Sequence, residues 1–463
     1  MTTALAARTG SPLTADLRLA WLLTRGSDRR EWWRIGLTAV GAALATGIGL
    51  AVAALNSLDG YYSVSFGAGL LDSASDRRNV SLLMGLLLVP VLGFLGQCAR
   101  IGAVHRDRRL AALRLAGAGA WQVRRIAALE SGPACLAGSL TATAVFVPLL
   151  HLWTRPTAFA WTGVALVAVA VPVLGAAVSA LSLRRVVASP LGWVRRVRPV
   201  WGPGRTLRAV IVLLGVAALF LGVSSLTGGP VRLALGPLAL FAVVLVVGAA
   251  TVSLAGTAAR RLGGVLAARA QSPALLIAAE RLRDDPWAAA RTHAAVLLVT
   301  VVGAGFVGVR QVLLAILDTM HREGTLGTDM AYYTTGIDLT AAAILVALAL
   351  TVTGLAVGTV ESLATRRRSL AAQVAAGVPY RVLARALLLE TALPLAPAVA
   401  VAGLGGTGIG AWYASLTTHH SGTGLPYAAL LVPVAVYAAC LLAAATSLPL
   451  LRRSVRPAEL RHT

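Results

Sequence analysis

The most recognisable chemical motif in this chain of 463 residues is a glycine-rich run, GLGGTG, from Gly403 to Gly408. It matches G-x-G-x-x-G, which cradles the phosphates of a dinucleotide when it follows a β-strand and opens a helix. Here the run lies inside a long apolar stretch, with no strand before it and no suitably placed acid after it. We therefore predict that these glycines allow membrane helices to pack closely.

Nucleotide hydrolysis by a lysine-containing phosphate loop is excluded by composition. All 41 basic residues are arginine, and the G-x-x-x-x-G-K-[ST] phosphate loop needs a lysine ammonium at the β- and γ-phosphates. If ATP drives this protein, another chain must hydrolyse it. We expect no enzymatic activity and no cofactor in this chain, and in that case ATP and magnesium would be bound by the other chain.

Metal-binding and catalytic side chains do not form a recognisable set. His419 and His420 have no carboxylate or cysteine nearby, and adjacent side chains point apart on a helix. The acids are few and offer neither a Ser-His-Asp arrangement nor a carboxylate pair. The cysteines lie in or beside apolar runs without metal-ligand spacing, so we expect small packing residues. They are Cys98, Cys135 and Cys440.

The composition suits a membrane as solvent. The chain is 57% hydrophobic and 13% charged, and its mean hydropathy is +0.78. Apolar runs of roughly 20 residues can cross a hydrocarbon core about 30 Å thick as helices. We expect an all-α polytopic membrane protein with about ten transmembrane helices. The predicted spans are 35–56, 80–100, 131–152, 159–183, 208–227, 233–258, 292–317, 338–361, 387–413 and 425–450.

The formal charge of +23 could suggest nucleic-acid binding, but the arginines fall in blocks between apolar runs. The loop 184–208 holds seven arginines and no acid. Acids gather instead in the alternate loops, which the predicted spans place on the other side of the membrane. This positive-inside pattern predicts a multi-pass protein of the cell membrane with both termini in the cytoplasm and no nucleic-acid partner. The abundance of Ala, Gly and Arg suggests a GC-rich bacterium.

One stretch of the first half recurs in the second. Residues 108–131 align without a gap with residues 368–391 at an offset of 260, and nine of the 24 positions are identical. A short helix at the membrane face, continuous with two spans, would transmit a push from a cytoplasmic partner. Gly117 and Gly377 would permit the reversal of the chain. The alternative is a basic loop that only fixes topology.

The duplication and a restart at Asp285-Pro286, a good N-cap and first-turn proline, divide the chain. Each half contributes four spans, and two further spans are inserted between them. The stretch Ala15 to Leu23 suits an amphipathic helix in the headgroup region. The predicted segments are 1–34 (cytoplasmic or interfacial), 35–185 (first repeat), 186–260 (cytoplasmic loop and inserted pair), 261–291 (second interfacial segment), 292–453 (second repeat) and 454–463 (cytoplasmic tail).

The repeated segment resembles the FtsX-like permease domain of ABC transporters. In that family the stretch reads approximately Arg-Arg-Glu-Ile-(apolar)-Leu-Arg-Ala-Leu-Gly-Ala, and a Leu-Glu pair enters the next helix. The matching residues are 108–118 with Leu129-Glu130, and 368–378 with Leu389-Glu390. The ending 456–461 is similar to the family's Asp-Pro-x-x-Ala-Leu-Arg. Two FtsX-like four-helix repeats with an inserted pair are similar to the MacB and bacitracin-resistance group, the bacitracin-resistance type above all.

The resemblance implies a permease subunit coupled to a separate ABC ATPase, with an ATPase dimer on each permease and lipids around it. It implies export or extraction of a lipophilic or amphipathic substrate, such as an antimicrobial peptide, a lipid or a hydrophobic natural product.

The chain departs from the family pattern in two ways. Arg109 and Ser369 replace the family's acid, so a salt bridge from it to the ATPase is absent or reversed. The longest outside loops, 57–79 and 318–337, have only about 20 residues, so work across a periplasm is implausible.

The residues expected to couple the permease to its ATPase flank the two glycines. Leu113, Leu115 and Val374 are expected to enter a groove of the partner, and Arg114 to meet acidic groups or anionic lipid. The full set is Leu113, Arg114, Leu115, Ala116, Gly117, Ala118, Val374, Ala375, Ala376, Gly377 and Val378.

Five further charged residues are candidates for structural or binding roles. Glu130 and Glu390 are expected to pair with nearby arginines, Arg125 and Arg385 among them, and so to brace the two stalks. Arg310, near the outer end of the seventh span, could contact substrate or lipid, snorkel, or pair with Asp318 or Glu323.

Two other functions fit parts of the pattern. A mechanical signaller could use the same ATPase strokes to regulate a cell-envelope enzyme or sensor kinase, although its short outside loops leave a partner little to contact. An ATP-independent secondary transporter with parallel repeats would need charges buried at the membrane midplane, and only Arg310 comes near that condition.

Overall fold

The computed structural model describes residues 29–58, 60–61, 68–98, 112–113, 115–153, 157–182, 230–416, 426–449 and 451. The chain divides into two compact units: unit 1 comprises Met1–Tyr62 and Leu71–Arg198, and unit 2 comprises Ser63–Leu70 and Pro199–Thr463. Several predicted features lie outside the described residues. They are the amphipathic stretch 15–23, the family-like positions 108–111 and Arg114, the arginine-rich loop, the fifth span 208–227, His419, His420 and the tail.

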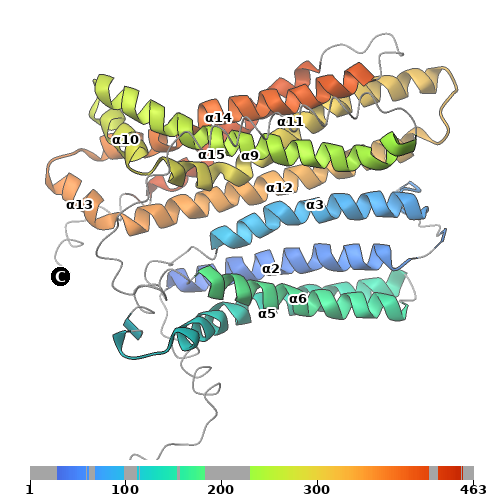
Figure 1. Ribbon diagram of the computed structural model, residues 1–463, viewed down its shortest axis with the longest axis horizontal. Helices are drawn as coiled ribbons and strands as arrows, with labels where there is room; N and C mark the ends of the chain where they lie inside the picture. Colours follow the sequence, from blue (N-terminus) through green and yellow to red (C-terminus); the bar gives the residue numbers. More distant parts are fainter. Residues whose placement is uncertain are drawn as a thin grey trace, which may run out of the picture. The chain divides into compact units, whose positions relative to one another are not determined.

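Unit 1 is built from four described helices that run side by side (Figure 1). They are α2 (Arg29–Asn56), α3 (Ala74–Cys98), α5 (Ala120–Trp153) and α6 (Ala158–Ser182). Helix α2 packs against the other three, and α5 also packs against α6. The unit is therefore organised around α2.

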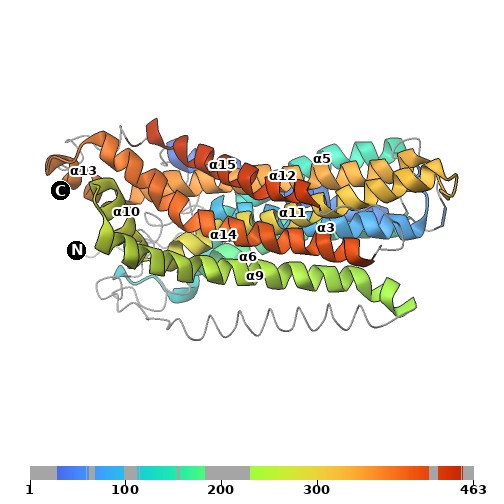
Figure 2. The same ribbon diagram turned by 90° about the horizontal axis from the view of Figure 1, so that it is seen from above.

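Unit 2 contains α9 (Pro230–Arg269), α10 (Pro273–Asp284), α11 (Pro286–Arg322), α12 (Met330–Thr365), α13 (Arg367–Ala375), α14 (Tyr380–Leu416), η1 (Tyr427–Leu430) and α15 (Leu431–Ala445). Helix α11 contacts α9, α12, α14 and α15. Apolar side chains from these five helices form one core, with Leu297, Leu355 and Leu395 fully buried in it. The short helices α10 and α13 lie at the same end of the unit in two perpendicular views (Figures 1 and 2).

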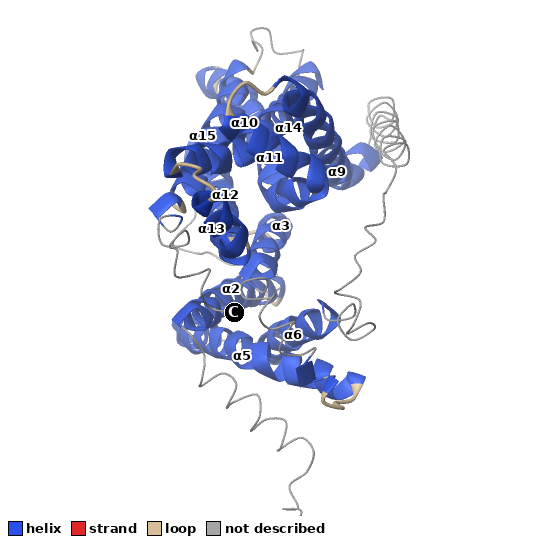
Figure 3. Cartoon of the chain, turned by 90° about the vertical axis from the view of Figure 1, so that its left-hand side faces the viewer, coloured by secondary structure: helices blue, strands red, loops and turns tan. Residues whose placement is uncertain are grey.

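The all-α membrane fold expected from the sequence is confirmed at the level of its helices. The residues that the structure describes contain helices and connections but no strand (Figure 3). Among the described residues, eight helical segments are long and apolar enough to cross a membrane. These are Ile35–Asn56, Ala74–Leu95, Trp121–Leu152, Ala158–Ala177, His293–Arg322, Met330–Ala364, Tyr380–Ser415 and Tyr427–Ala445. The sixth predicted span, 233–258, lies within α9.

The helices extend further than the predicted spans. The predicted outside loop 318–337 is largely helical, because α11 continues to Arg322 and α12 begins at Met330. An apolar side chain holds the α12 extension in the fold, since Ile337 is buried. A hydropathy window about 20 residues long detects the bilayer-sized core of a helix and not its ends.

Local sequence explains several helix ends. Helix α3 begins after Ser73, whose hydroxyl accepts from the backbone N–H of Asp76 at 3.2 Å and donates to the Asp76 carboxylate at 2.7 Å. Helix α10 begins after Ser272, whose hydroxyl accepts from the N–H of Leu275 at 3.3 Å. Pro286 opens α11, as predicted, where a missing N–H costs nothing.

The glycine-rich run packs helices closely, as predicted. It lies in the interior of α14, and a Cβ on Gly406 would be 2.5 Å from the carbonyl oxygen of Val301 and 2.7 Å from the Cβ of Ala304. One turn further on, a Cβ on Gly410 would be 2.9 Å from the Cα of Gly308. The backbones of α11 and α14 thus touch through glycine, which membrane helices use because packing brings little hydrophobic gain in lipid.

Unit 1 has a similar contact. A Cβ on Gly138 of α5 would lie 2.1 Å from the carbonyl oxygen of Ala39 and 2.9 Å from the backbone nitrogen of Ala43, both in α2. Each unit therefore has a pair of helices, α2 with α5 and α11 with α14, whose approach depends on glycine.

A buried arginine organises the connection between α2 and α3. The side chain of Arg77 is almost fully buried, and its guanidinium donates four hydrogen bonds to backbone carbonyl oxygens. Nη1 donates to Leu71 and Asp72, both at 2.9 Å, and Nη2 donates to Leu58 at 3.0 Å and Gly60 at 2.6 Å. The planar fork of arginine thereby joins the two ends of the connection.

The glycine contact is tested by changing Gly406→Ala, with Gly408→Ala as the matched control. Both changes raise helix propensity equally, but only Gly406 faces the backbone of α11, and nothing lies within 4 Å of a Cβ at Gly408. We expect Gly406→Ala to lower the free energy of unfolding by about 1–3 kcal/mol, measured by thermal unfolding in detergent. Equal melting temperatures for the two variants would show that the contact is not tight.

The arginine clamp is tested by changing Arg77→Lys, with the exposed neighbour Arg78→Lys as control. An ammonium cannot reproduce the fork, so carbonyl oxygens lose their donors, and we expect a destabilisation of about 2 kcal/mol. The control should remain within about 0.5 kcal/mol of the parent. The measurement is thermal unfolding in detergent. An Arg77→Lys protein that is as stable as the Arg78→Lys control would contradict the clamp.

Candidate functional site

The best-defined turn at the α10 and α13 end of unit 2 is a glycine elbow between α13 and α14. Gly377 has a φ of +92°, a left-handed conformation that favours glycine. Its N–H donates to the carbonyl of Val374 at 2.9 Å, and the N–H of Val378 donates to the carbonyl of Gln373 at 3.0 Å. This pair of bonds is a Schellman motif, which ends α13 and turns the chain into α14 at Tyr380.

The corresponding turn of unit 1 has the same geometry. Gly117 has a φ of +100°, and the N–H of Ala118 donates to the carbonyl of Leu113 at 3.0 Å. Helix α5 then begins at Ala120, 260 residues before the start of α14. Nothing lies within 4 Å of a Cβ on either glycine. The backbone conformation, and not packing, therefore explains glycine at both positions.

One face of α13 packs against its own unit. Leu370 and Ala371 are buried, and Leu370 belongs to an apolar cluster with Leu363, Leu383, Leu387 and Leu451. Val374 and Val378 are partly buried against the same cluster. Val374 is thus half-buried against its own unit, and its contact with a partner stays a prediction.

The opposite face of α13 is exposed and small. Ala372, Ala375, Ala376 and Gly377 are exposed, as are Arg368 and Ser369 at the start of the helix. In unit 1, Ala116, Gly117 and Leu115 are exposed and Leu113 is half-buried. The predicted coupling residues that are exposed in unit 2 are therefore Ala375, Ala376 and Gly377, which have only a methyl group or a hydrogen as side chain.

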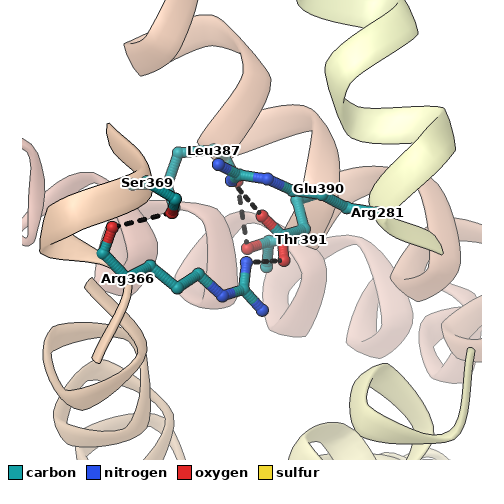
Figure 4. Close-up of polar contacts among 6 residues, drawn as sticks. All are labelled: Arg281, Arg366, Ser369, Leu387, Glu390 and Thr391. Carbon is teal, nitrogen blue, oxygen red and sulfur yellow. Dashed lines mark hydrogen bonds and ion pairs between the residues drawn. The ribbon is translucent and has the colours of Figure 1, made fainter. Parts of the chain in front are cut away.

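A carboxylate joins three elements beside the elbow (Figure 4). Glu390 of α14 accepts from Arg281 of α10 at 2.9 Å through one oxygen and from Arg366 at 2.6 Å through the other. Arg366 is the junction residue between α12 and α13. The side chain of Glu390 is only 20% exposed. We call Arg281, Arg366 and Glu390 the ionic triad.

The triad is strong because of its surroundings. Both bonds join ionised groups and are short, so each exceeds a neutral hydrogen bond in strength. Limited exposure reduces screening by water and salt. Ser369 also donates to the backbone carbonyl of Arg366 at 2.9 Å (Figure 4). The residue that replaces the family-like acid thus supports the same junction.

The expected pairing of Glu390 with arginine is found, but with other arginines than Arg385. Residues five apart on a helix point in different directions, so Arg385 faces elsewhere. Arg385 is exposed and lines a shallow groove of about 350 Å³ between the start of α10 and α14. Spacing within the repeat could not reveal Arg281, which lies 109 residues away in the sequence.

The equivalent residues of unit 1 lie on α5. Glu130 is 5% exposed, which is unusual for a carboxylate, and Arg125 is half-buried. Glu130 and Arg125 are also five residues apart, so their side chains leave α5 in different directions.

Arg310 pairs with an acid that the sequence analysis did not select. Its guanidinium lies 3.7 Å from the carboxylate of Asp338 on α12. Asp318, one of the acids considered as a partner for Arg310, instead pairs with Arg322 at 3.0 Å. Antiparallel neighbours α11 and α12 bring Arg310 and Asp338 together across the hairpin.

The cysteines are free and buried, in agreement with a packing role. Burial raises the pKa of the Cys98 thiol to about 12, so it is protonated at neutral pH and a poor nucleophile. In the part of the chain that the structure describes, no three His, Cys, Asp or Glu side chains come together to hold a metal ion.

The triad is tested with Glu390→Gln, which keeps the shape but removes the charge. Two guanidinium groups then lie close together without compensation, and we expect a loss of about 2–4 kcal/mol in the free energy of unfolding. The control is Glu280→Gln, which removes an ion pair with Arg283 whose side chains are 53% and 50% exposed. Such pairs contribute about 1 kcal/mol or less. Melting temperatures measured in detergent should separate the variants, and equal effects would refute the triad's structural importance.

Among family models, curated proteins and solved structures, none matches this chain. What the protein does must therefore be argued from the geometry of the elbows and the triad and from the residue pattern of the repeated segment.

Proposed function

We propose that this chain is the permease subunit of an FtsX-like ABC transporter, in which a separate ATPase dimer docks on the two glycine elbows. The observation that carries the proposal is the ionic triad. It ties α10 and the α12–α13 junction, where the helix leading to the elbow begins, to α14, a helix long and apolar enough to cross a membrane. Force applied to α13 would therefore reach a spanning helix directly.

The packing of α13 supports transmission over a merely topological role. A basic loop that only fixed orientation would need no packed helix, whereas α13 buries Leu370 and Ala371 against residues of other elements. The Arg281 and Arg366 bonds then connect α10, the α12–α13 junction and α14. These parts would move together when a partner pushes on the exposed face.

The number of elbows supports a two-subunit partner. Gly117 and Gly377 have the same backbone conformation and the same capping bond, and each precedes a long helix by three residues. One permease would thus offer two docking surfaces, one to each subunit of an ATPase dimer. Both elbows, and both termini, would face the cytoplasm.

Charge distinguishes this docking surface from the family pattern. Arg366, Arg367 and Arg368 are consecutive, and Ser369 follows where the resemblance has an acid. We infer that the ATPase presents acidic side chains here, because a basic partner would be repelled. The small exposed side chains of Ala375 and Ala376 allow close approach of that partner's surface.

The proposed cargo is a lipophilic or amphipathic molecule taken from the bilayer and exported or extracted, such as an antimicrobial peptide, a lipid or a hydrophobic natural product. The described spanning helices expose large apolar side chains, including Leu166, Leu345 and Leu442. These faces suit a substrate that approaches through lipid.

The proposal is tested by co-expressing the chain with ABC ATPases from its own genome, beginning with any that a neighbouring gene encodes. We expect the two to co-purify, and ATP hydrolysis to respond to the permease in nanodiscs. The double change Ala116→Trp and Ala376→Trp adds bulk to both exposed elbows and should abolish association. Gln271→Trp, equally exposed on the α9–α10 connection, should not.

Two outcomes would overturn the proposal. If the ATPase binds the double variant as well as it binds the parent, the elbows are not its docking surfaces. If no ATPase associates and transport proceeds without ATP, the chain is a secondary transporter. ATPase coupling without movement of any amphiphile would favour a mechanical signaller.

A further inference from the structure

An exposed pair of opposite charges lies between α11 and α12. The guanidinium of Arg310 and the carboxylate of Asp338 are 3.7 Å apart, and their side chains are 44% and 70% exposed. This distance is too long for a hydrogen bond, and neither side chain donates to or accepts from another described residue. Both groups keep their hydrogen-bonding capacity open to a ligand.

Neighbouring aromatic residues place this pair at a membrane interface. Gly410 of α14 touches Gly308 of α11, and the two helices run in the same direction. Trp412 and Tyr413 therefore lie at the height of Arg310. Tryptophan and tyrosine concentrate where hydrocarbon meets the headgroups.

A second contact, between α11 and η1, also places an aromatic residue at the level of Arg310 along the membrane normal. Gln311, next to Arg310, accepts through its side chain from the backbone N–H of Ala428 in η1 at 3.2 Å. Tyr427, the first residue of η1, is 73% exposed. A third aromatic ring thus lies at the level of the charged pair, and its exposure suits the headgroup region.

Helix length gives an independent measure. Asp338 precedes Arg366 of the ionic triad by 28 residues along α12, which corresponds to about 42 Å of helix. A bilayer including its headgroups is about 40–45 Å thick. The triad and the Arg310–Asp338 pair therefore match the two opposite headgroup layers.

An apolar stripe runs from the pair toward the middle of the membrane. Ala342, Leu345, Val346 and Ala349 follow Asp338 at helical spacing on one face of α12, and all are exposed. The stripe covers about 16 Å, comparable with the acyl part of one leaflet, which is half of about 30 Å. A charged end and an apolar stripe together form an amphiphile-shaped surface.

From these observations we propose that the Arg310–Asp338 pair binds a zwitterionic phospholipid with an N–H-bearing ammonium, phosphatidylethanolamine in class, in the leaflet opposite α13. Its phosphate lies against the guanidinium of Arg310, and its ammonium donates to the carboxylate of Asp338. Its acyl chain follows the stripe on α12. The opposite signs of the two side chains match the two charges of this headgroup, and the site does not depend on coupling to an ATPase.

A choline headgroup fits less well because its quaternary nitrogen has no N–H to donate. A glycerol headgroup brings no cation, so the carboxylate of Asp338 stays unmatched beside the lipid phosphate. The site should therefore rank ethanolamine above choline and glycerol headgroups.

The experiment titrates the full chain in detergent with short-chain phosphatidylethanolamine, phosphatidylcholine or phosphatidylglycerol, and counts bound lipid by native mass spectrometry. We expect the ethanolamine lipid to bind roughly fivefold more tightly than the glycerol lipid, the preference of one partly exposed ion pair. Asp338→Asn should remove this preference. Arg310→Gln should weaken binding of all three lipids, since each carries the phosphate.

The matched control is a second exposed pair on α11. Asp318 and Arg322 have the same chemistry, and their side chains are 62% and 69% exposed. The double change Asp318→Asn and Arg322→Gln should leave the lipid preference intact. Equal binding of the three lipids by the parent would overturn the proposal. So would variants at Arg310 and Asp338 that lower the melting temperature but keep the preference, because the pair would then only join two helices.

Discussion

The carboxylate of Glu390 holds one end of unit 2 together, because it bonds at once to α10 and to the α12–α13 junction. Removing it would leave two cations close together at a site with little water to screen them. The start of α13 is thereby fastened to α14, and Leu370 of α13 adds an apolar contact with Leu383 and Leu387 of α14. The functional proposal follows from it, since a partner can move a spanning helix only through a firmly attached contact.

Glycine provides the complementary constraint further along the same helix. Gly406 and Gly410 bring α14 into backbone contact with α11, so the helix that carries Glu390 at one end is fixed to the centre of the unit at the other. In lipid, where burial of apolar surface gives little driving force, close backbone approach supplies the packing energy. Ionic attachment at one end and glycine contact at the other thus fasten α14 to α10, to the α12–α13 junction and to α11.

Much of the helical fold could be predicted from the sequence, because a bilayer demands long apolar helices and the chain shows them plainly. Most helix ends could not be predicted, since hydropathy reports bilayer thickness and α11 and α12 continue beyond it, although Pro286 marked the start of α11. Gly117 and Gly377 were recognisable because a left-handed turn favours one residue type. The arginine partners of Glu390 could not be recognised in the sequence, because Arg281 comes from a distant helix and Arg385 points away. The partial burial of Val374 within its own unit could not be predicted, because amphipathicity alone does not say which surface, internal or foreign, covers an apolar face.

The Arg77 clamp has a consequence for where this protein can fold. Loops outside a membrane are often closed by disulfides, which form only in oxidising surroundings. The connection between α2 and α3 is instead closed by hydrogen bonds from one guanidinium, and the three cysteines of the chain are all reduced. Its shape is therefore independent of redox potential, and this part of the protein can mature without any oxidoreductase.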